Sequence, residues 1–231
     1  MELREHIGAP VKNHRVIEGG CYHDGVYYLM FGNMTQETTV IVKLLHGKEK
    51  KVLGASKPLK VGHANDCCVR GDTIYITHSG RSNAIHRVSA TTLKKLSDVT
   101  ITGCKGGFNG ISCMGKGYIV KKMSSKKCYI LDKDFKYKST MTLSKTRKVG
   151  QGMTWVDGKL YRGASQGQSK ENWVSIYNSK GKCIKEYQYK HECELEDVFV
   201  FGETIKCSVY KKYTKKGKKH FEAYIRTVHE G

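Results

Sequence analysis

The chain has 231 residues, with 39% apolar residues, 25 Gly and only 2 Pro, which excludes a disordered or collagen-like chain and suits a folded protein with many tight turns. Its 41 Lys and Arg exceed its 21 Asp and Glu, for a formal charge of +20, so we expect anionic partners, with a Lys-rich surface that only maintains solubility as the alternative. No apolar run is long enough to cross a bilayer and no signal peptide opens the chain, so we expect no membrane contact and a cytoplasmic location.

The nine cysteines have no regular spacing and include no CxxC pair. Several lie within apolar strand patterns, as Cys21, Cys113 and Cys207 do. This pattern predicts free, buried thiols in a reducing compartment and no zinc site. We expect no cofactor, and an oxygen-ligated Ca²⁺ at the acidic residues described below is an alternative.

A repeated unit runs through the chain: a polar residue, a small or acidic residue, a few apolar residues, a Gly-containing turn, and a β-rich run. In chain order the copies are EGGCYHDGVYYLMF from Glu18, NDCCVRGDTIYITHS from Asn65, NGISCMGKGYIVKKM from Asn109, QGMTWVDGKLYRGAS from Gln151 and EDVFVFGETIKCSVY from Glu196. Their starts are 47, 44, 42 and 45 residues apart, close to the length of a four-stranded propeller blade.

Each copy predicts two strands around a turn such as Asp24-Gly25 or Asp157-Gly158. A third strand follows as TVIVKLL, AIHRVS, KCYILD, WVSIYN and FEAYIR, and a fourth as KKVLGA, LSDVTIT, YKSTMTL and IKEYQY. The fifth copy lacks a fourth strand. We therefore predict that residues 2–7 supply the outer strand of the last blade and close the ring.

The sequence thus predicts an all-β fold, a single domain over residues 1–231 that forms a five-bladed β-propeller of four-stranded blades. A β-sandwich could use the same number of strands. It would not require five equivalent polar openings at equal spacing, so we prefer the propeller.

The innermost strand of each propeller blade begins near the mouth of the central channel, so the repeat openings predict a ring of polar side chains. Its first members are Glu18, Asn65, Asn109, Gln151 and Glu196, and its second members are Gly19, Asp66, Gly110, Gly152 and Asp197. His63 and Glu194 each precede a first member by two residues. Such a ring can form a binding site, or its side chains can tie one blade to the next by binding backbone groups.

Basic residues are expected around this ring, because the loops between second and third strands lie on the same face. We predict Arg81, Lys122 and Lys211 in these loops, and Arg162 beside them, as ligand contacts. The alternative for the last loop, YKKYTKKGKK, is a solvated, mobile segment. Together with Glu18, Asn65, Asn109, Gln151 and Asp197, these cations suit a ligand that carries phosphate or carboxylate.

At VGHANDCCVRGDTIYITHS the chain resembles a group of uncharacterised five-bladed propeller proteins of bacteria and phages whose second blade opens with GHAND. The x-G-G-C opening of the first blade, the Gln151-Gly152 pair and the acidic Glu194-Leu195-Glu196 opening agree, so the resemblance covers nearly all of residues 15–228. It implies the fold and no activity. The segment Gly150-Gln151-Gly152-Met153 is also similar to the blade openings of plant-type glutamine cyclotransferases, another family of five-bladed propellers.

Three functions fit these observations. The first is capture of a small anionic or polar ligand, nucleotide-like or glycan-like, at the channel mouth. The second is an enzyme in which Glu196, Asp66 or His63 acts as general acid or base, in a cyclisation or a metal-independent phosphodiester cleavage. The third is a protein-interaction scaffold. The sequence decides neither catalysis nor oligomeric state.

Overall fold

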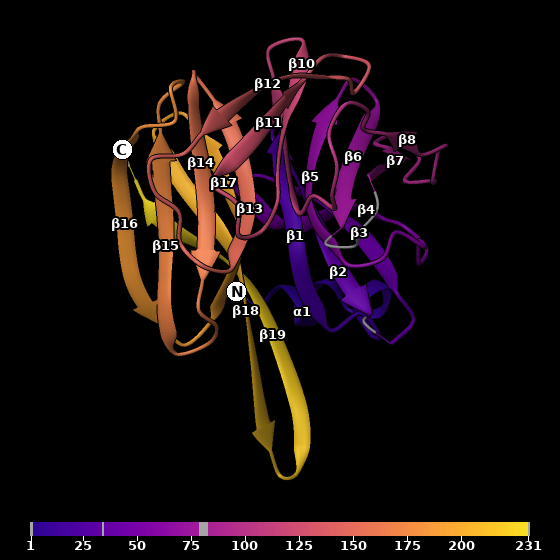
Figure 1. Ribbon diagram of the computed structural model, residues 1–231. Helices are drawn as coiled ribbons and strands as arrows, with labels where there is room; N and C mark the ends of the chain where they lie inside the picture. The colour runs from indigo at the N-terminus through magenta and orange to yellow at the C-terminus, as the bar shows by residue number, and fades with distance from the viewer. Residues whose placement is uncertain (1, 34, 79–82, 231) are drawn as a thin grey trace.

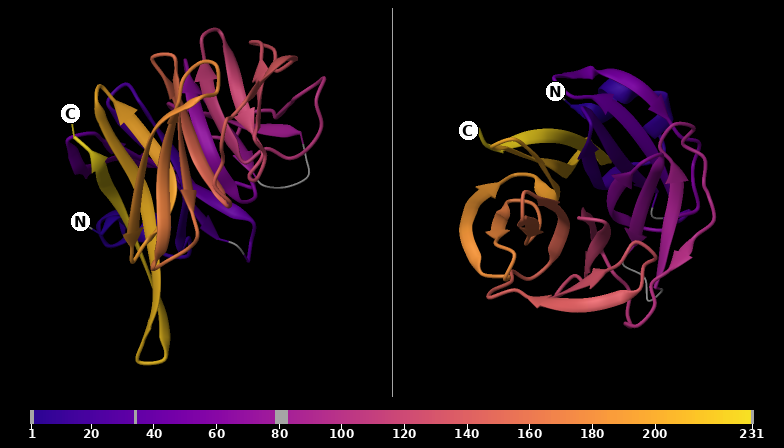
Figure 2. Two further views of the ribbon diagram at one scale, coloured as in Figure 1. Left: turned by 60° about the vertical axis from the view of Figure 1, so that its left-hand side comes forward. Right: turned by 90° about the horizontal axis from the view of Figure 1, so that it is seen from above.

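Five antiparallel β-sheets arranged around a common axis form the molecule, which confirms the predicted five-bladed propeller (Figures 1 and 2). The computed structural model describes residues 2–33, 35–78 and 83–230. Each blade is a meander in which strands consecutive in sequence pair with one another. No helix among these residues is long and apolar enough to cross a membrane.

The blades follow one another in chain order, and their strands match the predicted runs. Blade 1 contains β1 (Val16–His23), β2 (Val26–Asn33), β3 (Thr38–Leu45) and β4 (Lys48–Ala55), and blade 2 contains β5 (Ala64–Arg70), β6 (Thr73–His78), β7 (Ala84–Ser89) and the short β8 (Val99–Thr100). Blade 3 contains β9 (Gly110–Met114), β10 (Gly117–Lys121), β11 (Lys127–Leu131) and β12 (Tyr137–Thr142). Blade 4 contains β13 (Gly150–Val156), β14 (Lys159–Ser165), β15 (Lys170–Tyr177) and β16 (Cys183–His191), and blade 5 contains β17 (Glu194–Phe201), β18 (Thr204–Lys215) and β19 (Lys218–His229).

The turns between first and second strands have the predicted chemistry. Asp24 and Gly25 have φ of 46° and 78°, and Asp157 and Gly158 have φ of 49° and 72°. Two successive residues with positive φ form the turn that matches the twist of a two-stranded hairpin. The side chains that face neighbouring blades then build five apolar clusters, one at each blade interface.

The predicted amino-terminal strand is wrong. Residues 2–7 instead begin the helix α1 (Leu3–Ile7), which is followed by the 3₁₀ helix η1 (Ala9–Val11), and blade 5 keeps three strands. Glu2 caps α1 by accepting hydrogen bonds from the Arg4 and Glu5 amides. Leu3 and Ile7 are buried, and their i, i+4 spacing places both on one face of a helix, whereas a strand would place the exposed Glu5 on the same face as these two residues.

Side chains of α1 occupy the open edge of β19 where a fourth strand would pair. The carboxylate of Glu2 accepts a hydrogen bond from the Ala223 amide at 2.6 Å, and Arg4 donates to the Phe221 carbonyl at 2.6 Å. The first and last segments of the chain therefore meet as predicted, but through side chains and without a shared strand.

The segment YKKYTKKGKK is a β-hairpin and not the loop that the sequence analysis expected. Strands β18 and β19 stay paired out to Lys215 and Lys218, and the hairpin projects from one face of the propeller (Figure 1). Because Glu194 pairs with Tyr210, β17 begins beside the base of this projection. The polar ring therefore opens on the face from which the hairpin projects, which we call the mouth face.

Candidate functional site

Four of the five first-ring residues lie where the innermost strands depart from regular pairing, whereas Asn109 immediately precedes the regularly paired β9. The β1–β2 register shifts at Glu18, the β5–β6 register at Asn65, and the β17–β18 register at Glu196. A similar shift covers Gln151 and Gly152 in β13. A bulge re-aims the extra residue of a strand, so the repeated polar residue coincides with a repeated irregularity of the backbone.

Asp66 and Asp197 occupy the propeller axis and connect the blades. The Asp66 Oδ2 atom accepts hydrogen bonds from the Ile111 amide of blade 3 at 2.8 Å and the Met153 amide of blade 4 at 3.0 Å. Asp197 accepts bonds from the Gly20 amide of blade 1 at 2.8 Å and from the Val198 amide at 2.7 Å. These contacts support, for the second ring, the interpretation in which polar side chains tie blade to blade.

The second-ring glycines leave room for this arrangement. A Cβ atom at Gly152 would lie 2.0 Å from Asp197 Oδ1, and one at Gly19 would lie 2.3 Å from the Asn65 carbonyl oxygen. Only glycine permits such close approach. The alternation of Gly and Asp around the second ring therefore follows from packing at the axis.

The two axial carboxyl groups lie within hydrogen-bonding reach of each other. Burial raises the pKa of both, and for Asp66 the nearby charge of Asp197 raises the pKa further. As a carboxylate, the buried Asp66 Oδ1 atom has no hydrogen-bond donor, whereas both Asp197 oxygens accept backbone amides. The pair is satisfied when Asp66 holds a proton on Oδ1 and donates it to Asp197.

Three further carboxyl groups surround the mouth itself. The Glu18 carboxylate and the half-buried His63 imidazole are in direct contact, with 2.6 Å between Glu18 Oε2 and His63 Nε2. Glu194 is hydrogen-bonded to the Tyr210 hydroxyl, and burial raises its pKa. Glu196 is 5% exposed, and burial, followed by the charges of Glu194 and Glu18, raises its pKa well above the usual range. Glu194 and Glu196 therefore hold protons more tightly than carboxyl groups in water do.

The carboxamide members of the ring differ in what they contact. Asn109 donates to the Gly150 carbonyl at 2.8 Å and so ties blade 3 to blade 4. Gln151 lies 3.4 Å from Glu194 Oε1. The side-chain oxygen of Asn65 is buried without a hydrogen-bond partner in the described structure. A buried acceptor without a donor is costly, so the Asn65 side chain lowers the stability of the folded chain in this arrangement.

A pocket of about 710 Å³ opens beside these carboxyl groups, and we call it the mouth pocket. Gly32 is one wall of this pocket and lies against Glu18, because a Cβ there would be 2.9 Å from Glu18 Cγ. Tyr210, which binds Glu194, forms another part. The remaining lining is mostly basic and amide side chains, namely Asn33, Gln36, Arg15, Lys212 and Lys219.

Phe221 is the aromatic floor of the mouth pocket and organises its cations. The Arg15 guanidinium carbon lies 5.7 Å from the Phe221 ring centroid, and Lys212 Nζ lies 5.9 Å from it. Both cations therefore lie within the range of cation–π attraction. The pocket combines an aromatic surface with three cations, Arg15, Lys212 and Lys219, whereas the carboxyl groups of the ring lie behind its wall and do not line it.

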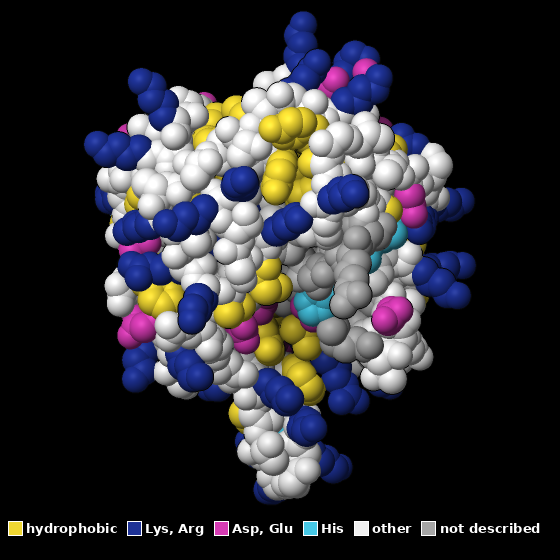
Figure 3. Space-filling view, viewed as in Figure 1, with side chains coloured by type: hydrophobic (Ala, Val, Ile, Leu, Met, Phe, Trp, Pro, Cys, Tyr) yellow, Lys and Arg dark blue, Asp and Glu magenta, His cyan; other side chains and the backbone are white. Residues whose placement is uncertain are grey.

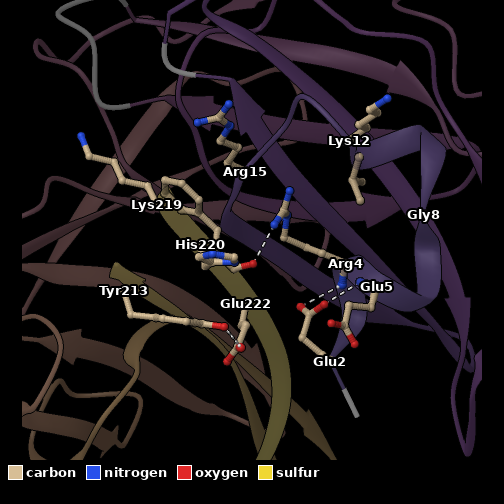
Figure 4. Close-up of a pocket in the computed structure, with 12 residues that line it drawn as sticks. Glu2, Arg4, Glu5, Gly8, Lys12, Arg15, Tyr213, Lys219, His220 and Glu222 are labelled. Carbon is tan, nitrogen blue, oxygen red and sulfur yellow. Dashed lines mark hydrogen bonds between the residues drawn. The ribbon is translucent and has the colours of Figure 1, made fainter. Parts of the chain in front are cut away.

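A second pocket of about 360 Å³, the side pocket, separates α1 from the same hairpin (Figure 4). It shares Arg15, Lys219 and Phe221 with the mouth pocket. Within it Tyr213 donates to Glu222 at 2.7 Å, and the Tyr213 ring stacks on His220 at 5.2 Å. The hairpin base therefore separates two cavities that share basic side chains.

The predicted basic contacts are scattered. Arg162 is 1% exposed and donates to the Met123 carbonyl at 3.0 Å, inside the molecule. Lys122 lies along the backbone at Gly106, and Lys211 pairs with Glu192 at 2.5 Å. None of these three lines the mouth pocket, and neither do the predicted ring contacts Glu18, Asn65, Asn109, Gln151 and Asp197. Arg81 lies outside the described residues.

The sequence indicated no role for Arg15, and it indicated Lys212, Lys219 and Tyr210 only as members of the segment YKKYTKKGKK. Arg15 precedes the first repeat, and the others belong to a segment interpreted as a loop. The turn Lys216-Gly217, which lies between the β-favouring residues Tyr213 and Thr214 and the run FEAYIR, was the signal that could have predicted their placement. Among the described residues no group of three or more His, Cys, Asp or Glu side chains is arranged to hold a metal ion.

No protein-family model matches the sequence, and neither does any curated protein. Among solved structures, Myxococcus xanthus glutaminyl cyclase superposes with a TM-score of 0.65 at 10% sequence identity, over 94% of this chain and 93% of that chain. The structure of U3-55K superposes with a TM-score of 0.53 at 9% identity, over 90% of this chain and 80% of that chain. At these identities the likeness concerns the fold alone.

Proposed function

We propose that the protein binds a small polar ligand with an anionic group, such as a phosphorylated or carboxylated nucleotide-like or glycan-like molecule, in the mouth pocket. The observation that carries this proposal is the 710 Å³ cavity lined by Arg15, Lys212 and Lys219, whose wall residue Gly32 lies against Glu18 of the ring. Arg15, Lys212 and Lys219 suit the anionic group. The hydroxyl or amine groups of the same ligand suit the carboxyl groups of Glu18 and Glu194, which would repel an anion.

The experiment is calorimetric titration of nucleotides, sugar phosphates and sugar acids against the purified protein. We expect Arg15→Ala to weaken binding of the ligand found by at least about tenfold, because one charge-assisted hydrogen bond contributes about 1.5–3 kcal/mol. Glu18→Gln should weaken it as well. Lys180→Ala, an exposed lysine on the opposite face, is the matched control and should leave affinity unchanged. Equal affinity of Arg15→Ala and the unaltered protein would contradict the proposed pocket.

A second function, acid–base catalysis by Glu196, is favoured by the raised pKa of that buried carboxyl group and by its neighbours Glu18 and Glu194. The fold shared with a protein named glutaminyl cyclase adds support for a cyclisation. In such a step the substrate amine attacks its own side-chain amide carbon, ammonia leaves, and Glu196 transfers the proton from the amine to the leaving nitrogen. His63, held by Glu18, would assist at the mouth.

Ammonia release from peptides with amino-terminal glutamine tests this second function. Glu196→Gln should abolish release while the peptide still binds, because the amide keeps the shape and loses the transferable proton. Asp66→Asn should keep activity, because Asp66 lies at the axis and is engaged by backbone amides. If no ammonia is released across the peptide panel, the catalytic role is wrong and the binding proposal stands.

A further inference from the structure

The projecting hairpin is longer than the propeller requires. Strands β18 and β19 have 12 residues each, whereas every other second and third strand has 5 to 8. The hairpin ends in Lys216 and Gly217, with φ of 49° and 72°, and residues 214–220 are exposed. An isolated two-stranded ribbon is only marginally stable in water, so this extension adds exposed surface and little stability.

The extension has a high positive charge density. Residues 211–219 include six lysines, and no acidic residue occurs from Thr204 to Phe221. Lys211 is paired with Glu192, but no ion pair with an acidic side chain of the described chain involves the other five. Figure 3 shows these basic side chains gathered along the projection. A concentration of unpaired cations of this kind suits a partner with closely spaced negative charges.

The lysines point to both sides of the ribbon. Directly paired residues share a face, so Lys215 and Lys218 lie on one face, whereas Lys219, paired with Thr214, shares the other face with Lys212. Lys216 lies at the tip. A flat anionic surface would engage one face only, whereas a groove with phosphates on both walls would engage both.

The dimensions and chemistry favour duplex DNA over a membrane. The major groove of B-DNA is about 12 Å wide and about 8.5 Å deep and admits a two-stranded β-ribbon. From Lys212 to the turn the strand spans roughly 13 Å at about 3.3 Å per residue, enough to reach the groove floor. Residues 214–219 are Thr, Lys and Gly only, so the tip has no apolar side chain to enter a bilayer.

We propose that the β18–β19 hairpin binds duplex DNA by entering the major groove, where lysines on its two faces contact the two phosphate backbones. Lys215, Lys216 and Lys218 do not line the mouth pocket and belong to this site alone, whereas Lys212 and Lys219 line the pocket as well. Because its contacts are mainly to phosphates, binding depends steeply on salt and weakly on sequence.

Fluorescence anisotropy with a labelled 20-base-pair duplex between 50 and 200 mM KCl tests the proposal. The variant K215A/K216A/K218A should bind at least about tenfold more weakly, and the slope of log affinity against log salt should become shallower by about 2 to 3, near 0.9 per lost phosphate contact. The control K116A/K180A/K182A removes the same charge from turns on the opposite face and should bind like the unaltered protein. Equal weakening of both variants would show that net charge alone is responsible and would overturn the proposal.

Competing nucleic acids and vesicles separate the alternatives. The unaltered protein should prefer duplex DNA to single-stranded DNA and to duplex RNA, whose major groove is deep and narrow, and to vesicles of anionic lipid. A duplex with bulky groups filling its major groove should bind poorly. Tighter binding to single strands, RNA or vesicles would overturn the proposal. Glu18→Gln, which alters the mouth pocket, should leave DNA binding unchanged, so failure of the pocket proposal is recognised separately.

Discussion

Asp66 and Asp197 are both buried carboxyl groups, but they tolerate substitution by asparagine differently, because Asp66 holds the proton and Asp197 accepts it. In Asp66→Asn the carboxamide oxygen can replace Oδ2 and the amide group can donate to Asp197, as the protonated acid does. In Asp197→Asn one amide group must face a backbone N–H, that of Gly20 or Val198. A buried polar group without a partner costs about 1–3 kcal/mol.

We therefore expect Asp66→Asn to unfold in urea with a free energy within about 1 kcal/mol of the unaltered protein, and Asp197→Asn to lose about 2 kcal/mol or more at pH 7. Each variant serves as the control of the other, since both remove one buried carboxyl group. The reverse order of stabilities would place the proton on Asp197.

Lys121 is a second buried titratable residue, and it gives a stability effect with a defined sign. The residue is 2% exposed, and its amine donates to the carbonyls of Lys122, at 2.8 Å, and Ser125. Burial, and then the charge of Arg162, lowers its pKa from 10.5 to about 7. Between these two pH values the unfolded chain binds more protons than the folded chain, so the Lys121 contribution to stability increases as pH rises.

The measurement is the difference in unfolding free energy between the unaltered protein and Lys121→Met at pH 7, 8, 9 and 10. The unfolding free energy of the unaltered protein, relative to that of the variant, should increase by up to about 1.4 kcal/mol per pH unit. Lys116→Met, at an exposed turn, should show no such trend. A difference that stays constant from pH 7 to 10 would mean that Lys121 is solvated in the folded state.

At the level of the element, α1 stabilises blade 5 by covering the edge of β19 with side chains. Glu2→Ala removes the helix cap and the bond to Ala223 together, and we expect a loss of about 1–2 kcal/mol. Urea unfolding measures the loss, and amide hydrogen exchange at Ala223 should accelerate. Glu5→Ala alters an exposed residue three positions further along the chain. This control should change neither the unfolding free energy nor the exchange rate at Ala223. Unchanged exchange at Ala223 in the Glu2 variant would exclude this role for α1.

Element by element, the sequence predicted the strands well, because an alternating apolar pattern and a positive-φ turn recur in every blade. The sequence did not predict α1. Because blade 5 lacked a fourth strand and residues 2–7 had no assigned element, we expected these residues to form that strand. The i, i+4 spacing of Leu3 and Ile7 was visible in the sequence, but five residues are too few for that spacing to compete with a topological expectation. The long β18–β19 hairpin was overlooked because its lysines suggested a loop.

At the scale of the molecule, the ring of polar openings was predictable because propeller symmetry brings equivalent positions together. The residues that each opening side chain contacts were not predictable. Asp66 reaches residues 45 and 87 positions away, and the mouth pocket joins Arg15 to Lys212 from opposite ends of the chain. Such neighbours depend on blade order and backbone irregularities that no local pattern specifies. For the same reason Arg162, polar and charged in sequence, proved to be buried.

The ring is closed without a shared strand, and this has a consequence for how the gene could be rearranged. Every blade is one uninterrupted stretch of chain, and the seam between the last and first blades is held by the Gly20–Asp197 bond and an apolar cluster like those at the other four interfaces. Joining the present ends through a flexible linker and opening the chain between any two other blades would break no sheet. A circularly permuted protein should therefore assemble the same ring from a different starting blade.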